Sequence, residues 1–302
     1  MINVLGHLHP DSDAVCTAYM ASRWLTLRGL QAQAWRCGEI NRETRFIFEQ
    51  SALPVPDLLT DSLADRDVWL VDFTEPTQGP ASLAESNVVG IIDHHRLGGL
   101  VTRLPPEVWV KPVGSSSTLL WQLMTPEIRR MITPAEALLM LGAVISDTVA
   151  LRSPTTTSDD TLAVEELSTL AGIEKDAFIA GLLTAKTSIE GLSGKALLNK
   201  DIKTFQIQGV KVNAAQIELF SLNQVDAVLD ELQEEMALNI QETGAQLVVV
   251  MLTDINAGYS TLYFAVPEGQ QADAPCKVEG MLSRKKQLLP WLENSLAKGK
   301  KR

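Results

Sequence analysis

The chain of 302 residues contains only four histidines, and all of them lie in two short clusters beside carboxylates. The first cluster reads H-L-H-P-D-S-D over residues 7–13, and the second reads D-H-H over residues 93–95. Imidazole and carboxylate groups gathered in this way are typical of metal sites. Because neither cluster contains a cysteine, the donor set favours Mn²⁺, Mg²⁺, Co²⁺ or iron over a structural zinc ion.

Both clusters are predicted to follow strands of a parallel sheet. Along the first 150 residues, short apolar runs alternate with amphipathic stretches, which is the pattern of repeated strand–helix–strand units. Ser12 is expected to cap the first helix, which should end at Gly29. The expected strands are 2–6, 31–37, 67–73 and 87–95, and the expected helices are 13–30, 115–124 and 134–150.

The acidic residues fall where such a sheet binds its ligands. Asp72 and Asp93 end two predicted strands, His7 follows the first strand, and Asp147 lies near the end of a predicted helix. Open α/β sheets bind ligands at the carboxyl ends of their strands, so these side chains are expected to converge. One ion does not need so many carboxylates. Two cations about 3.5–4 Å apart, sharing a bridging carboxylate, would use them and would suit attack on a phosphoryl group.

The composition changes at 186–195, a stretch of small and polar residues that we interpret as a linker. The predicted fold class is α/β, with a doubly wound, mostly parallel sheet in residues 1–185 and a smaller α+β domain in residues 196–302. In the second domain we expect a helix at 222–244, strands at 245–254 and 260–266, and a solvated basic tail at 298–302.

The second domain carries a basic motif, S-R-K-K-Q, at 283–287. Its three cations form either a solvated turn or a clamp for a polyanion, since Arg offers a bidentate fork and Lys a mobile charge. Lys203 is a weaker candidate of the same kind. In the first domain, the serine loop at 114–118 either cradles phosphate with backbone N–H groups or caps the helix that follows.

Charge and hydropathy argue against two classes of partner. A net charge of -11 disfavours sequence-independent nucleic-acid binding, which depends on Lys and Arg neutralising phosphates. No apolar run reaches the roughly 18 to 20 residues that cross a bilayer, and the first residues lack a signal-peptide pattern. We therefore expect a cytoplasmic protein with no membrane partner, and its three cysteines fit reduced thiols.

Five motifs together resemble one family. G-H-x-x-P-D-S-D at 6–13, V-D at 71–72, D-H-H at 93–95, S-D-T at 146–148 and S-R-K-K-Q at 283–287 are similar, in order and spacing, to those of the family II, manganese-dependent inorganic pyrophosphatases. The resemblance extends from the first strand almost to the C terminus. D-H-H alone would fit the wider DHH superfamily, whereas S-R-K-K-Q points to the pyrophosphatase branch.

The resemblance implies hydrolysis of pyrophosphate by a hydroxide held between two Mn²⁺ ions, with Co²⁺ or Mg²⁺ as alternatives and further Mg²⁺ or Mn²⁺ arriving with the substrate. The implied ligands are His7 and Asp11 for one ion, Asp13, His94 and Asp147 for the other, and Asp72 as the bridge. Four further residues are implied to bind the substrate and assist catalysis: His95, Lys203, Arg284 and Lys285. Domain closure across the linker and a homodimer formed through the N-terminal domain are also implied.

Two stretches depart from the family pattern. The family usually reads H-x-N-P-D and V-D-H-N-E, where this chain has His9 in place of Asn, and Phe73 and Thr74 in place of His and Asn. We hypothesise that His9 supplies the imidazole that Phe73 removes. The departures leave open an exopolyphosphatase or another DHH phosphoesterase acting on short polyphosphates or nucleotides. A non-enzymatic binding protein with a relic site is a further alternative.

Overall fold

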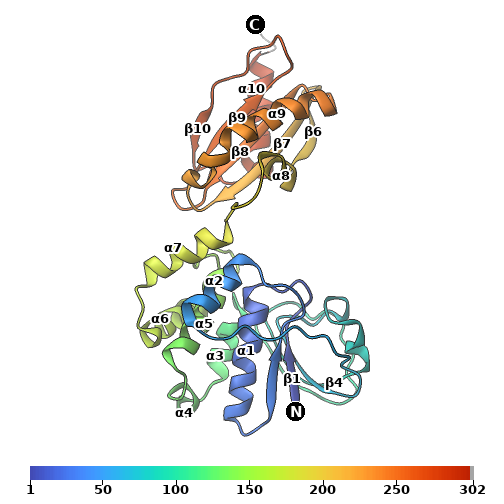
Figure 1. Cartoon of the computed structure of the whole chain (residues 1–302), viewed down its shortest axis with the longest axis vertical. Coiled ribbons are helices and arrows are strands. Elements are labelled where there is room, and N and C mark those ends of the chain that lie inside the picture. Colours follow the sequence, from blue (N-terminus) through green and yellow to red (C-terminus); the bar gives the residue numbers. More distant parts are fainter. Residues whose placement is uncertain (300–302) are drawn as a thin grey trace. The chain divides into compact units, whose positions relative to one another are not determined.

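The computed structural model describes residues 1–299 and divides into two compact units, Met1–Lys186 and Thr187–Arg302. Each unit has a five-stranded sheet with helices packed against it (Figure 1). The last three residues of the predicted basic tail lie outside the described residues. None of the described helices combines the length and the apolar character needed to cross a bilayer.

The first unit contains a parallel sheet in the order β2-β1-β3-β4-β5, which confirms the predicted sheet. The order reverses between β1 and β3, and open parallel sheets bind ligands at such a switch point. The fifth strand was not predicted, and most of its residues are exposed. The strands are Ile2–Leu5 (β1), Ala32–Trp35 (β2), Asp67–Val71 (β3), Asn87–Asp93 (β4) and Glu107–Val110 (β5).

Helices pack against one face of this sheet. Helix α1 contacts β1 and β3 on one side and α5 on the other, and α5 is buried along almost its whole length. The opposite face is covered around Leu63 and Leu83, partly by the 3-10 segments Pro76–Gln78 (η1) and Ala81–Glu85 (η2). The helices are Ser12–Leu27 (α1), Arg42–Ser51 (α2), Ser116–Leu123 (α3), Pro126–Arg129 (α4), Pro134–Asp147 (α5), Ser158–Ala171 (α6) and Lys175–Lys186 (α7).

The cap of α1 differs from the prediction. Asp11, not Ser12, is the N-cap, because the Asp11 carboxylate accepts a hydrogen bond from the backbone N–H of Ala14 at 2.9 Å. Ser12 is instead the first helical residue, and its hydroxyl lies 2.9 Å from the hydroxyl of Thr44 in α2. Helix α5 begins as predicted, with Pro134 in its first turn.

The second unit has a mixed sheet in the order β10-β9-β8-β7-β6, in which β7 and β8 run parallel. Alternate residues of β8 face opposite sides: Val248 and Val250 pack in the core with α8 and α9, whereas Val249 and Met251 pack with α10. The elements are Gly194–Lys200 (α8), Lys203–Ile207 (β6), Val210–Leu219 (β7), Leu229–Thr243 (α9), Leu247–Asp254 (β8), Tyr259–Ala265 (β9), Cys276–Glu279 (β10) and Leu289–Gly299 (α10).

The helix predicted over 222–244 is two elements in the structure. A 3-10 segment, Leu222–Val228 (η3), precedes α9. The Gln224 side chain accepts hydrogen bonds from the backbone N–H of Ser221 at 3.2 Å and from the hydroxyl of Thr187 at 3.2 Å. These contacts anchor the first turn to another segment of the chain, which overrides the helical periodicity of the sequence.

Candidate metal centre

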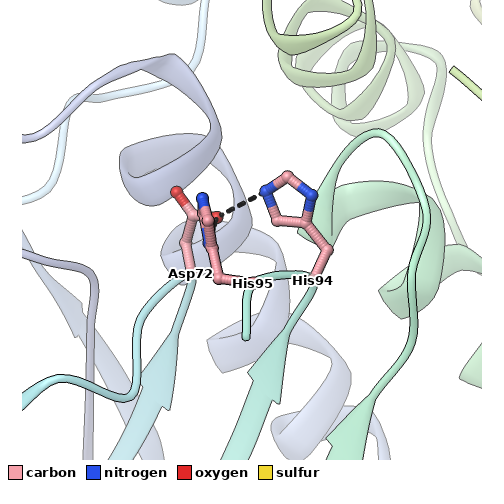
Figure 2. Close-up of side chains that lie close together, drawn as sticks. All are labelled: Asp72, His94 and His95. Carbon is pink, nitrogen blue, oxygen red and sulfur yellow. Dashed lines mark ion pairs between the residues drawn. The ribbon is translucent and has the colours of Figure 1, made fainter. Parts of the chain in front are cut away.

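Six of the predicted site residues converge at the carboxyl edge of the first sheet. Their potential ligand atoms form two groups, within each of which the atoms lie within 4.8 Å of one another. A third group joins Asp72 to His94 and His95, and Figure 2 shows both imidazoles beside the Asp72 carboxylate. The two main groups are His7, Asp11 and Asp72, and Asp13, His94 and Asp147.

Asp72 lies between the two main groups. Its Oδ2 is 3.5 Å from Nε2 of His7, and its Oδ1 is 3.2 Å from Nε2 of His94. The hydroxyl of Ser116 donates a hydrogen bond to Oδ1 at 3.0 Å. The residue follows β3 with a φ of 68°, a left-handed conformation that Asp and Asn tolerate better than most other residues. Each carboxylate oxygen therefore faces a different group, an arrangement in which one carboxylate can bridge two ions.

Both inner histidines present Nε2 to the carboxylates. Nδ1 of His7 lies 2.8 Å from the carbonyl oxygen of Leu8, and Nδ1 of His94 lies 2.9 Å from that of Val113. A carbonyl oxygen only accepts hydrogen bonds, so the proton of each neutral imidazole belongs on Nδ1, and Nε2 carries the lone pair. This tautomer and orientation are those of a metal-ligating histidine.

Buried atoms without hydrogen bonds indicate what the site can hold. Nε2 of His94 and Oδ2 of Asp147 are both buried, lie 3.2 Å apart and have no hydrogen-bond partner of acceptable geometry. Two acceptors so close together repel each other unless a proton or a cation lies between them. The donor set, imidazole nitrogens and carboxylate oxygens without thiolate, fits Mn²⁺ and similar divalent ions.

The charges of the cluster shift the pKa values of its histidines. Burial alone would lower the pKa of His7, but Asp11 and Asp72 outweigh it and raise this pKa to about 11. Burial also opposes the charged form of His94, yet Asp147 and Asp72 raise its pKa to about 12. Cations that bind here must displace these protons, so their affinity depends on pH.

The serine loop before α3 holds Asp13. The hydroxyl of Ser115 donates to Oδ1 at 2.7 Å, and the backbone N–H groups of Ser116 and Ser117 donate to Oδ2 at 2.6 Å and to Oδ1 at 3.2 Å. Ser115 also caps α3. The backbone N–H groups that were predicted either to bind phosphate or to be capped thus donate to the Asp13 carboxylate. That this loop positions Asp13 was not predicted.

Asp93 orients the D-H-H turn. Its Oδ1 accepts hydrogen bonds from the backbone N–H groups of His94 at 2.8 Å and His95 at 3.1 Å, and Nδ1 of His95 lies 3.0 Å away. The contact with Asp93 raises the pKa of His95, whose side chain is 55% exposed. His95 is therefore held beside Asp72 but remains accessible.

The predicted substrate-binding cations lie in the second unit, where two of them meet at Asp201. The guanidinium of Arg284 is 3.0 Å from Oδ2 of Asp201, and it also donates to the carbonyl oxygens of Asp201 and Ala214. Nζ of Lys203 lies 3.8 Å from Oδ1 of Asp201, with 63% of its side chain exposed. The sequence did not single out Asp201.

The ends of the S-R-K-K-Q motif shape its turn. The motif begins the π-helix Arg284–Leu288 (η4), and Ser283 caps it by accepting a hydrogen bond from the backbone N–H of Lys286. The side chain of Gln287 accepts from the backbone N–H groups of Leu282 at 2.8 Å and Ser283 at 3.0 Å. Lys285 and Lys286 remain exposed, whereas Arg284 is mostly buried.

His9 is exposed and has a φ of 52°, and among the described residues it belongs to none of the groups of potential metal ligands. Phe73 is buried in the core with Leu83. That His9 compensates for Phe73 therefore stays a prediction.

Comparisons with known proteins agree along almost the whole chain. The model of the DHH family, N-terminal domain, matches residues 1–144, and the model of the DHHA2 domain matches residues 180–295. A Deinococcus radiodurans protein assigned as a manganese-dependent inorganic pyrophosphatase is 34% identical over 98% of this chain and 99% of its own length. A Staphylococcus aureus protein with the same assignment is 33% identical over 98% of both chains.

Solved structures give the same correspondence. A Methanococcus jannaschii protein assigned to the family II inorganic pyrophosphatases superposes with a TM-score of 0.62 at 31% identity, covering 97% of this chain and 99% of the other. An exopolyphosphatase-related protein from Bacteroides fragilis superposes with a TM-score of 0.52 at 15% identity, covering 98% of this chain and 92% of the other, which is a likeness of fold alone.

Proposed function

The chain belongs to the family of manganese-dependent inorganic pyrophosphatases, and on this premise we propose that it hydrolyses pyrophosphate to two phosphates with a pair of divalent cations, Mn²⁺ first among them. The observation that carries the proposal is Asp72, whose two oxygens face two separate groups of ligands. A pair of such cations lowers the pKa of water and offsets charge on phosphoryl oxygens.

We assign His7, Asp11 and Asp72 to one ion and Asp13, His94 and Asp147, again with Asp72, to the other. The lone pairs on Nε2 of the histidines and the unpaired oxygen of Asp147 support this assignment. His95 is proposed to contact the substrate. Asp93 holds the proton on Nδ1 and raises the pKa of His95, so the protonated ring can donate a hydrogen bond from Nε2 to a phosphate oxygen.

Lys203, Arg284 and Lys285 are proposed to bind the phosphates, since positioning and electrostatic stabilisation do most of the work in phosphoryl transfer. Lys203 and Lys285 are exposed, which supports a role in binding an anion from solvent. We propose residues 1–185 as the metal-binding domain, 196–302 as the substrate-binding domain and 186–195 as the linker about which they close. Closure would exclude water from the bound substrate.

A cytoplasmic homodimer formed through the first unit is the proposed assembly. In the described residues, β5 pairs with β4 on one side only, and its Val108, Trp109 and Val110 are 47%, 41% and 38% exposed. An open strand edge with apolar side chains readily pairs with a second chain. The small anion pyrophosphate is the proposed partner, with no nucleic acid and no membrane.

The test is a phosphate-release assay on pyrophosphate and tripolyphosphate, run in parallel with Mn²⁺, Co²⁺ and Mg²⁺. We expect pyrophosphate to be hydrolysed faster than tripolyphosphate, with the highest rate in Mn²⁺. Faster hydrolysis of tripolyphosphate would identify an exopolyphosphatase instead. No phosphate from either substrate under any of these ions would favour a binding protein.

A further inference from the structure

Lys186, the last residue of the first unit, bonds to the peptide that leads into Asp147. Its Nζ donates to the carbonyl oxygen of Ser146 at 3.3 Å and lies 3.5 Å from the Ser146 hydroxyl. That carbonyl belongs to the peptide group joining Ser146 to Asp147, the last residue of α5. A side chain that holds this peptide also limits where the Asp147 carboxylate can lie.

The same ammonium group is paired with Glu43 in the first turn of α2. Nζ lies 3.1 Å from Oε2 and 3.3 Å from Oε1 of Glu43, whose side chain is only 7% exposed. A carboxylate buried to this extent requires a partner, so the pair fixes Lys186 against α2. The neighbouring residue Thr44 contacts Ser12, which lies between Asp11 and Asp13. The first turn of α2 therefore contacts the segment 11–13 directly, and it is linked to the segment 146–147 through Lys186.

The backbone of residues 149–151, just after Asp147, is strained, and contacts from other segments are needed to hold it in place. Val149, Ala150 and Leu151 have φ values of 49°, 54° and 64°, three successive left-handed residues without a glycine. Such conformations are costly, above all for a β-branched residue, and they persist where the surrounding structure imposes them. The end of α5 thus needs contacts from outside the helix, and Lys186 supplies two of them.

We infer that Lys186 is a positioning residue for Asp147, and that through the Ser146 peptide it sets the affinity of the ion bound by Asp13, His94 and Asp147. The inference rests on the proposed function, because that function assigns Asp147 as a ligand. It also ties this ion to the point where the chain passes into the second unit, since the next residue is Thr187.

The test is a titration with Mn²⁺ in the absence of substrate, following the paramagnetic resonance signal of the free ion to resolve two dissociation constants. The dissociation constant that rises in Asp147→Asn belongs to the ion bound by Asp13, His94 and Asp147. In Lys186→Met this dissociation constant should rise by about 10-fold, which is typical of losing a residue that orients a metal ligand. The other dissociation constant should stay unchanged. Lys186→Arg, which keeps the charge and the donors, should restore the constant that Lys186→Met raises.

The matched control is Lys111→Met, because Lys111 pairs with Asp159 in the same unit but on an exposed surface. It should leave both constants unchanged. If Lys186→Met does not fold, Lys186→Met combined with Glu43→Met removes the unpaired buried charge and serves instead. The inference is overturned if neither constant changes, or if both weaken equally together with the melting temperature. If the wild-type protein released no phosphate from pyrophosphate, the proposed function would be refuted. The change in the Mn²⁺ dissociation constant in Lys186→Met would still test the inference.

Discussion

Replacing Asp72 by Asn removes one negative charge at the point where the two groups of ligands meet. The side chain is 1% exposed, and its oxygens lie 3.5 Å from Nε2 of His7 and 3.2 Å from Nε2 of His94. Asn has nearly the same shape and adopts the left-handed φ of 68° as readily as Asp. The fold should therefore persist, and the bridging charge alone should change.

The size of the effect follows from the position of this charge. Burial opposes ionisation of Asp72, but the adjacent imidazoles of His7 and His94 hold its pKa well below the usual range, so the charge is present near neutral pH. A cation bound by either oxygen lies within about 4 Å of the charge, and at an effective dielectric constant of about 20 each unit of ionic charge then loses about 4 kcal/mol. This corresponds to about a 10³-fold loss of affinity for each unit of charge, so each divalent ion should lose at least about 10³-fold in affinity.

A titration with Mn²⁺ measures the loss of ion affinity in the Asp72 variant, and a phosphate-release assay measures its loss of turnover. Asp65→Asn is the matched control, because Asp65 also has a left-handed φ, 58°, but pairs with Arg103 on an exposed surface. The control should bind Mn²⁺ and release phosphate as the wild type does. If the Asp72 variant retained turnover within about tenfold of the wild type at saturating Mn²⁺, the bridging role would be refuted.

Three further predictions concern the support, protonation and substrate side of the site. Ser116→Ala, which removes the hydroxyl that donates to Asp72, should weaken Mn²⁺ binding by about 10-fold in a titration while leaving the melting temperature of the metal-free protein little changed. Because the pKa values of His7 and His94 are raised to about 11 and about 12, Mn²⁺ must displace protons; its affinity should rise from pH 6 to pH 8, with proton release detected by calorimetry in buffers of different ionisation enthalpy. Lys285→Ala should raise KM for pyrophosphate more than it lowers kcat, and a fall in kcat alone would contradict binding by this exposed lysine.

The convergence of the candidate metal ligands was predictable because it depends on local patterns. Val71 and Asp93 end short apolar runs that are typical of buried parallel strands, and the carboxyl ends of such strands lie at one edge of the sheet. Asp72 and His94, which follow these strands, therefore had to meet there. No knowledge of the loops was needed.

The supporting contacts were not predictable, since they join polar residues far apart in the chain. Ser115 and Asp13 are 102 residues apart, and Arg284 and Asp201 are 83 apart. Hydroxyl groups and carboxylates have many potential partners, and hydrophobic periodicity does not select among them. The choice of Asp11 over Ser12 as the cap of α1 has the same cause, because both residue types cap helices well.

The departure from the family pattern at Phe73 and Thr74 leaves the geometry around Asp72 intact. Phe73 fills the core beside Leu83, and the hydroxyl of Thr74 donates to the carbonyl oxygen of Arg96 at 3.3 Å and accepts from the backbone N–H of Gly98 at 2.8 Å. These contacts tie the segment after β3 to the segment after the D-H-H turn without an imidazole. We therefore expect the ions to bind without an imidazole at position 73, whereas the buried Phe73 offers no polar contact to a substrate. The departure should therefore alter turnover or preferred chain length rather than Mn²⁺ affinity, which the comparison of pyrophosphate with tripolyphosphate measures directly.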